Sequence, residues 1–154
     1  MSAVQSAALT HDDTFAKHYV HQAMVGYEGA KMSKSRGNLV LVSRLRADGV
    51  DPMAVRLGLL ADHYRSDRQW TDDVLKTGEE RLSRWRSAAA APAGPSGEGL
   101  LAAVREALAA DLDTPAALAI IDAWAEAALS GVGDDTEAPA LLAKTTDALL
   151  GVRL

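Results

Sequence analysis

The stretch that decides the fold class covers residues 51–64 and reads DPMAVRLGLLADHY. Asp51 followed by Pro52 is a strong helix start, because an aspartate accepts hydrogen bonds from free amides at the helix N-terminus and proline fits the first helical position. Apolar or aromatic side chains then recur at helical spacing, at Met53, Leu57, Leu60, Ala61 and Tyr64. The stretch therefore predicts a helix that buries one face.

The chain downstream of this helix predicts further helices. Thr71 with Asp72 and Asp73 is typical of a helix N-terminus. The seam that follows has spacings of 3, 4, 3 and 4 residues, as in helices that pack on helices, and consists of Leu75, Gly78, Leu82, Trp85 and Ala89. After a flexible loop near 88–99, rich in proline and glycine, three more helices are expected over about 101–112, 115–130 and 138–150.

The fold expected from residue 51 onward is therefore a bundle of four or five helices. Trp70, Trp85 and Trp124 are interpreted as core residues, because their spacing offers no platform for stacking bases. Upstream, residues 18–25 are rich in β-forming side chains and predict a buried strand. Gly26 and Gly29 then mark a tight connection into residues 31–35.

Residues 31–35 read KMSKS and are the best candidate for chemistry. Two lysines and two serines within five residues, closed by Gly37, can place cations and hydroxyl groups around a polyphosphate. The structural alternative is a solvated basic turn. The charge distribution fits an anionic ligand here, since residues 31–86 hold 12 Lys and Arg against eight Asp and Glu, although the whole chain carries a net charge of −5.

Composition excludes several other classes of protein. The chain has no cysteine, so it offers neither a disulfide nor a thiolate ligand for zinc. No apolar run is long enough to span a bilayer and no secretory signal is visible, so a cytoplasmic location is expected. His18 and His21 would fall on opposite faces of the predicted strand, which argues against a shared metal. His63 and Arg65 are interpreted as a polar cluster that supports the loop.

A strand, a glycine-bracketed turn and then KMSKS together resemble the signature loop of class I aminoacyl-tRNA synthetases. The sequences of residues 51–52, 63–66, 70–73 and 111–118 are similar to the cysteinyl branch of that class. Within this branch, residues 36–40 and 81–86 resemble the cysteine ligases of mycothiol biosynthesis more than cysteinyl-tRNA synthetase. The end at Leu154 also favours the ligases, because cysteinyl-tRNA synthetase is expected to continue into tRNA-binding sequence.

The resemblance implies a mostly α chain in two parts. Residues 1–50 are expected to be the C-terminal remnant of a Rossmann-like α/β nucleotide-binding domain, and residues 51–154 a helical bundle. Such ligases also carry a His-Ile-Gly-His-like ATP motif and a zinc site with Cys and His ligands, and neither is present here. The chain is therefore interpreted as a C-terminal portion of a ligase with no metal ligands of its own, and a missing N-terminal half is a candidate partner.

The resemblance also implies a reaction and the roles of individual residues. The ligases join L-cysteine to the amine of glucosaminyl-inositol through cysteinyl-adenylate, using ATP with Mg²⁺. Lys31 and Lys34 are the expected catalytic residues, which stabilise charge on the phosphates. Met32, Ser33 and Ser35 complete the expected ATP and adenylate site, in which Met32 anchors the loop and the serines bind phosphate or cap the backbone.

Val25 matches the family position whose backbone meets adenine, and a plain core valine is the alternative. Three functions remain open from the sequence: the cysteine ligase, a cysteinyl-tRNA synthetase fragment, and a non-catalytic helical module that binds a partner. The expected small-molecule substrates are cysteine, ATP and glucosaminyl-inositol, without a membrane and without tRNA.

Overall fold

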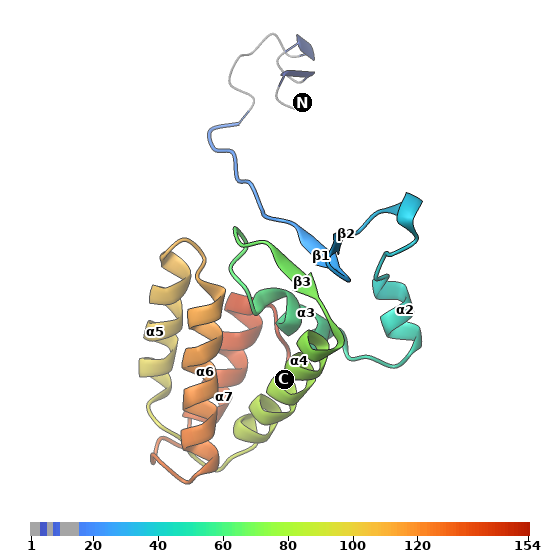
Figure 1. Ribbon diagram of the computed structural model, residues 1–154. Coiled ribbons are helices and arrows are strands. Elements are labelled where there is room, and N and C mark those ends of the chain that lie inside the picture. The colour runs from blue at the N-terminus through green and yellow to red at the C-terminus, as the bar shows by residue number, and fades with distance from the viewer. Residues whose placement is uncertain (1–3, 6–7, 10–15) are drawn as a thin grey trace.

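A computed structural model describes residues 4–5, 8–9 and 16–154 (Figure 1). Helices make up most of this part of the chain, which confirms the mostly α fold class. A small sheet lies beside the bundle, and the segment from β2 to α2 projects from the sheet on the side away from α5, α6 and α7. Much of the N-terminal half of the expected unit 1–50 lies outside the described residues, and the boundary at residue 50 stays a prediction.

The sheet has three strands in the order β2-β1-β3, namely β1 (Val25–Tyr27), β2 (Ala30–Lys31) and β3 (Arg68–Trp70). β1 and β2 form an antiparallel hairpin in which Gly26 faces Lys31. Glu28 and Gly29 connect them with φ values of 52° and 73°, the left-handed pair that a tight two-residue hairpin requires. β3 pairs in parallel with β1, so a strand from the region expected to form the bundle, residues 51–154, is joined to the strand that leads through the hairpin to residues 31–35.

The strand predicted over residues 18–25 is wrong except for Val25. Residues 18–24 belong to no strand, and β1 continues to Tyr27. Instead of a ladder, two isolated backbone bonds anchor this segment, from the Ala23 amide to the Tyr64 carbonyl and from the Arg68 amide to the Met24 carbonyl. β-Branched and aromatic side chains favour strand formation only where a neighbouring strand is present.

The helices confirm most of the capping predictions. They are α2 (Val42–Ala47), α3 (Pro52–Leu60), α4 (Asp72–Ala89), α5 (Gly97–Ala109), α6 (Thr114–Leu129) and α7 (Ala138–Thr145), which continues into the π-helical turn η2 (Thr146–Leu150). Asp51 caps α3 by accepting a bond from the Met53 amide at 2.8 Å, and this bond lowers the pKa of Asp51. Thr71 caps α4 through the Val74 amide at 3.2 Å.

Several predicted boundaries differ from the structure, beginning with the first helix, because α3 ends at Leu60 and does not reach Tyr64. The connection expected over residues 88–99 is shorter, because α4 extends to Ala89 and α5 begins at Gly97, capped by Ser96. Asp135 holds this connection: its backbone exchanges two bonds with Gly94, and its carboxylate accepts the Gly97 amide at 2.9 Å. α6 begins at Thr114, one residue before the predicted start, and its cap is Asp113, whose carboxylate accepts the Ala116 amide.

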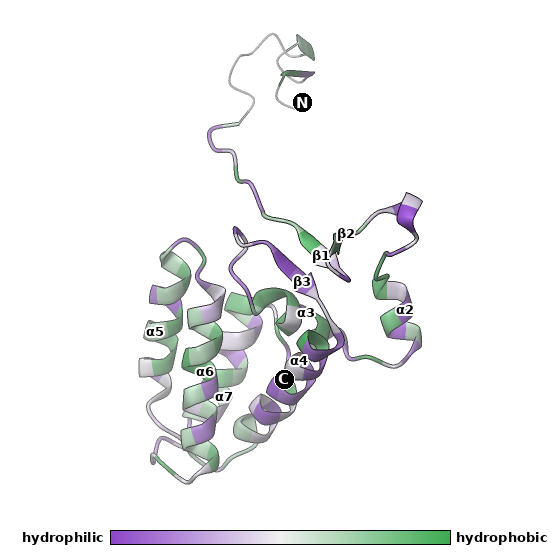
Figure 2. Ribbon diagram, in the orientation of Figure 1, coloured by the Kyte–Doolittle hydropathy of each residue, from purple (hydrophilic) through white to green (hydrophobic). Residues whose placement is uncertain are grey.

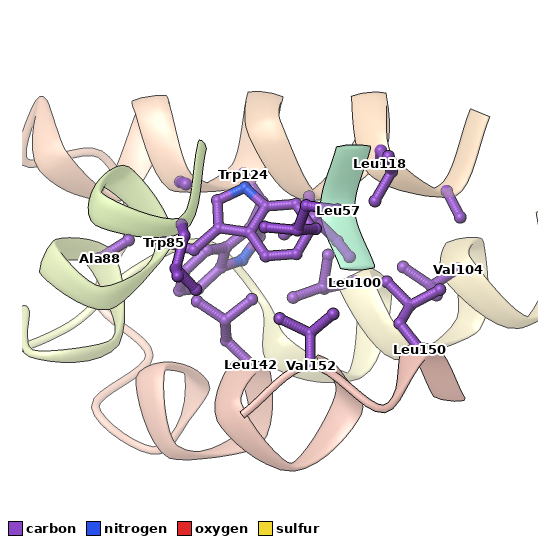
Figure 3. Close-up of a cluster of buried hydrophobic side chains, with 14 of the residues drawn as sticks. Leu57, Trp85, Ala88, Leu100, Val104, Leu118, Trp124, Leu142, Leu150 and Val152 are labelled. Atoms are coloured by element: carbon purple, nitrogen blue, oxygen red, sulfur yellow. The ribbon is translucent and has the colours of Figure 1, made fainter. Parts of the chain in front are cut away.

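The hydrophobic core lies between the helices of the bundle. Trp85 and Trp124 lie in it with leucine and valine side chains from α3, α5, α6, α7 and the C-terminal segment (Figure 3). Trp70 is also buried, at the end of β3, so all three tryptophans are core residues as predicted. Figure 2 shows that α4 is amphipathic: strongly hydrophilic residues alternate along the helix with apolar ones. The apolar residues form the face that packs against the core.

A polar cluster crosses the core and joins α4 to α6. The carboxylate of Asp122 accepts two bonds from Arg81 Nε, at 2.9 and 3.2 Å, and one from Trp85 Nε1 at 2.8 Å. Trp85 is fully buried, so Asp122 supplies an acceptor to an indole NH that water cannot reach.

The crossing of α3 and α4 is close because Gly78 faces the backbone of α3. A Cβ added at Gly78 would lie 2.5 Å from the carbonyl oxygen of Ala54. We expect Gly78→Ala to destabilise the fold by about 1–3 kcal/mol, although alanine favours an isolated helix by about 1 kcal/mol over glycine. Urea denaturation measures the difference. The matched control is Gly99→Ala in α5, where the new Cβ would meet only Ser96, at 3.4 Å, and equal stability of the two variants would contradict the prediction.

Candidate functional site

Residues 31–35 form a short, internally bonded loop directly after the hairpin. β2 ends at Lys31, and a single 3₁₀ turn, η1 (Lys34–Arg36), follows. Ser33 begins this turn, since its Oγ accepts the Arg36 amide at 3.3 Å. Gly37 ends the turn with φ of 68°, and its amide donates to the Lys34 carbonyl. The backbone of the loop is therefore shaped by its own hydroxyl and amide groups.

Asn38 closes the loop, a role that the sequence analysis missed. Its Oδ1 accepts the Ser33 amide at 2.9 Å, and its Nδ2 donates to the Lys31 carbonyl at 3.3 Å. The side-chain amide of Asn38, at the end of the loop, thus bonds to the backbone of Lys31 and Ser33 at its beginning. The available signal was an asparagine directly after the left-handed Gly37, a place where asparagine side chains often bond to nearby backbone.

We expect Asn38→Ala to loosen this loop without unfolding the protein. The Ser33 amide loses its acceptor, and a bond of about 1 kcal/mol corresponds to roughly fivefold faster hydrogen exchange at that amide. Exchange measured by NMR gives the result, with Ser43→Ala in α2 as the control. An unchanged rate at Ser33 in N38A would show that Asn38 does not hold the loop.

Both lysines of the loop are exposed. Within the described part of the chain, neither ammonium group lies within 4 Å of a carboxylate, whereas Lys76 in α4 approaches Glu80 at 3.9 Å. Two cations without anionic partners on a preshaped loop can bind an external anion such as a polyphosphate.

The sequence profile of a known family matches residues 2–80, which include the hairpin, the loop and the first half of α4. The family is described as the catalytic domain of class I (C) tRNA synthetases. The chain belongs to this family. Its match covers 79 of 154 residues and therefore extends beyond the predicted boundary at residue 50.

Curated relatives are similar over nearly the whole chain. An L-cysteine:1D-myo-inositol 2-amino-2-deoxy-alpha-D-glucopyranoside ligase of Salinispora arenicola is 65% identical over 153 residues, which are 99% of this chain and 37% of that ligase. Ligases of the same name from Gordonia bronchialis and Thermobifida fusca are 62% identical over 98% of the chain and 59% identical over 100% of it. The chain spans about 37% of their length. The predicted resemblance is thus confirmed.

The structure places the other predicted residues of this synthetase-family site around the hairpin. Val25 opens β1, half-buried, one position before Gly26, whose cross-strand partner is Lys31. Val25 and Lys31 therefore lie on neighbouring positions of one hairpin. Met32 is half-buried, and Ser35 Oγ lies 3.3 Å from Ser33 Oγ. Ser33 thus caps the backbone, and its contact with phosphate stays a prediction.

Gln69 of β3 supports the hairpin and was also missed. Its Oε1 accepts the Gly29 amide at 3.2 Å. Its side chain lies so close to Gly26 that an added Cβ there would be 2.4 Å from Nε2, so a larger residue at this position would require the Gln69 side chain to move. The sequence gave no sign of this contact, because Gln69 is 40 residues away from Gly29.

His63 and Arg65 belong to a polar cluster, as predicted, but the contacts that the structure shows join them to the bundle rather than to residues 31–35. Their common partner is Asp111, in the turn between α5 and α6. His18 and His21 are exposed. Among the residues placed in the structure, no group of three or more His, Asp or Glu is arranged to hold a metal ion, and no helix is long and apolar enough to cross a membrane.

Proposed function

We propose that this chain supplies the phosphate-binding loop of an ATP-dependent cysteine ligase that acts on the amine of glucosaminyl-inositol. The observation that carries the proposal is the pair Lys31 and Lys34, held on a self-capped loop without carboxylate partners among the described residues, in a chain 65% identical to a relative named as such a ligase. Family membership supports adenylate chemistry, because the matched domain is a synthetase catalytic domain.

In the proposed first step, a cysteine carboxylate oxygen attacks the α-phosphorus of ATP. The bond from that phosphorus to the β-bridging oxygen breaks, and pyrophosphate leaves with the electron pair. Lys31 and Lys34 stabilise the negative charge that grows on the leaving phosphates, together with the Mg²⁺ expected to accompany ATP. In the second step the amine attacks the cysteinyl carbonyl, AMP leaves, and the amine loses a proton.

Zinc belongs to the proposed parent enzyme rather than to this chain. The family resemblance implies a zinc site with cysteine ligands, and the sequence contains no cysteine. The residues present here therefore do not fit the metal, and no step is assigned to it. Cysteine, ATP and glucosaminyl-inositol are the proposed small-molecule substrates. A cytoplasmic location is part of the proposal, because free cysteine stays reduced there.

A chimera tests the ligase function against the tRNA alternative. This chain replaces the matching segment of the Salinispora arenicola ligase, and the purified chimera is supplied with ATP, cysteine and either glucosaminyl-inositol or cysteine-specific tRNA. We expect cysteinyl-glucosaminyl-inositol and no charged tRNA, both measured by mass spectrometry. Charging of tRNA would favour cysteinyl-tRNA synthetase, and a folded chimera without either product would favour the non-catalytic helical module.

We expect the isolated 154-residue chain to form no cysteinyl-adenylate, because it lacks a His-Ile-Gly-His-like motif and every cysteine ligand for zinc. Cysteine-dependent exchange of pyrophosphate into ATP measures this step, with the Salinispora ligase as positive control. Exchange by the isolated chain that disappears in its Lys34→Ala variant would contradict the prediction and would exclude a contaminating synthetase as its source.

A further inference from the structure

A groove of about 580 Å³ separates the sheet from the helical bundle. We call it the Leu112 groove. Its apolar lining comes from β1, α3, the α5–α6 region and η2, and consists of Val25, Leu59, Leu60, Leu108, Leu112, Leu149 and Leu150. It is separate from residues 31–35, none of which lines it.

Three leucines on this groove remain exposed to water. Leu112 is 56% exposed, Leu59 41% and Leu149 36%. Exposed apolar area costs about 25 cal/mol for each Å² that could be buried, and apolar side chains gathered around one hollow are typical of a surface that contacts another protein segment.

The backbone at Leu112 is strained. Asp111 and Leu112 have φ values of 57° and 56°, and two successive left-handed residues other than glycine cost about 1–2 kcal/mol each. The cluster on Asp111 maintains this conformation: Tyr64 donates to its carboxylate at 2.8 Å and Arg65 at 2.6 Å, while His63 Nε2 contacts its carbonyl at 2.8 Å. The Tyr64 bond, followed by Arg65, also lowers the pKa of Asp111. The Asp111 cluster thus maintains a strained turn in which the side chain of Leu112 is exposed to solvent.

Two arginines add a charge requirement to the groove. Arg56 and Arg68 line it together with one carboxylate, Asp62, and neither arginine lies within 4 Å of a carboxylate among the residues that the structure describes. Arg56 Nε donates to the Leu150 carbonyl and Arg68 Nη1 to the Ser66 carbonyl at 3.3 Å, whereas Arg68 Nε is buried without a hydrogen-bond partner among the described residues. Buried donors are almost always paired in native proteins, so Arg68 indicates that an acceptor is missing.

We propose that the Leu112 groove is the docking surface for the part of the longer ligase that lies outside this chain, through an apolar segment that carries a carboxylate. The length of the relatives supports this occupant, since 37% of the Salinispora ligase is matched and the remainder has to pack somewhere. Some residues that line the groove lie inside the family match at residues 2–80 and others lie outside it. An occupant would therefore hold β1 and β3 against the helical bundle. This inference rests on the proposed membership in a ligase of that length.

Thiol labelling tests this proposal without any need for activity. The chain has no cysteine, so Leu112→Cys introduces its single thiol, and Leu129→Cys in α6, at a position 47% exposed, is the matched control. Each variant is labelled with a maleimide as the isolated chain and within the Salinispora chimera, and peptide mass spectrometry separates the new thiol from those of the relative. We expect L112C to react at least about tenfold more slowly in the chimera and L129C to change less than about twofold, because thiol reactivity follows exposure.

Equal labelling rates for L112C in the chain and the chimera would overturn the proposal. Protection in the isolated chain that rises with protein concentration would also overturn it, because a second copy would then be the occupant. The two proposals fail separately. A catalytically active chimera with an unprotected L112C thiol refutes the groove alone, and an inactive chimera with a protected thiol refutes the function alone.

Discussion

Lys34→Ala is expected to reduce cysteine-dependent pyrophosphate exchange about 100-fold to 1,000-fold in the Salinispora chimera. This is the loss typical of removing one preorganised group that stabilises transition-state charge. Lys34 lies at the start of η1, where Ser33 and Gly37 fix the backbone around it. No neighbouring carboxylate among the described residues holds its ammonium group, so the substitution removes a cation without breaking an ion pair.

The control for this prediction is Lys76→Ala. Lys76 is an exposed lysine of α4 whose ammonium group lies 3.9 Å from Glu80, a contact that contributes little to stability. We expect K76A to keep the exchange rate of the unmodified chimera. If K34A and K76A lost the same small amount of activity, residues 31–35 would be a solvated basic turn and not a phosphate site.

Asp122→Ala is expected to destabilise the folded chain by about 2–4 kcal/mol, because two donors lose their acceptor at once. Trp85 Nε1 is left unpaired in the core, and Arg81, whose side chain is 18% exposed, loses both bonds to the carboxylate. For a chain of this size the loss corresponds to a decrease in melting temperature of roughly 5–15 °C. Circular dichroism at 222 nm follows the transition.

Glu126→Ala provides the matched control, since it removes an exposed carboxylate one turn later on α6. Asp122→Asn is the finer variant, which keeps one acceptor for Trp85 and is expected to lose less stability than D122A. A D122A protein that melts at the same temperature as E126A would show that the cluster contributes nothing to the packing of α4 on α6.

The helical part of the fold could be predicted from the sequence because its signals are local. Asp51 and Thr71 act as caps within three residues of themselves, and the α4 seam through Trp85 repeats at the period of the helix. The position of residues 31–35 could be predicted for the same reason, since a glycine-bracketed turn precedes them. These features depend on neighbours in the chain and need no knowledge of distant contacts.

The sheet and the supports of the site could not be predicted in this way. β3 is three residues long and largely polar, so no periodicity identifies it, and its pairing with β1 joins residues 43 positions apart. Asn38 and Gln69 act through amide bonds to backbone groups that composition does not reveal. The Asp111 cluster spans 46 to 48 residues of sequence, which explains why His63 and Arg65 were assigned to the loop.

The most direct test of the proposed function is cysteine-dependent pyrophosphate exchange by the chimera that carries this chain in the Salinispora ligase. The account predicts exchange within about tenfold of the unmodified ligase, because the exchanged segments are 65% identical, and near-complete loss when Lys31 and Lys34 are both replaced by alanine. A folded chimera that shows no exchange above the cysteine-free background, or one whose exchange survives the double replacement, would contradict it.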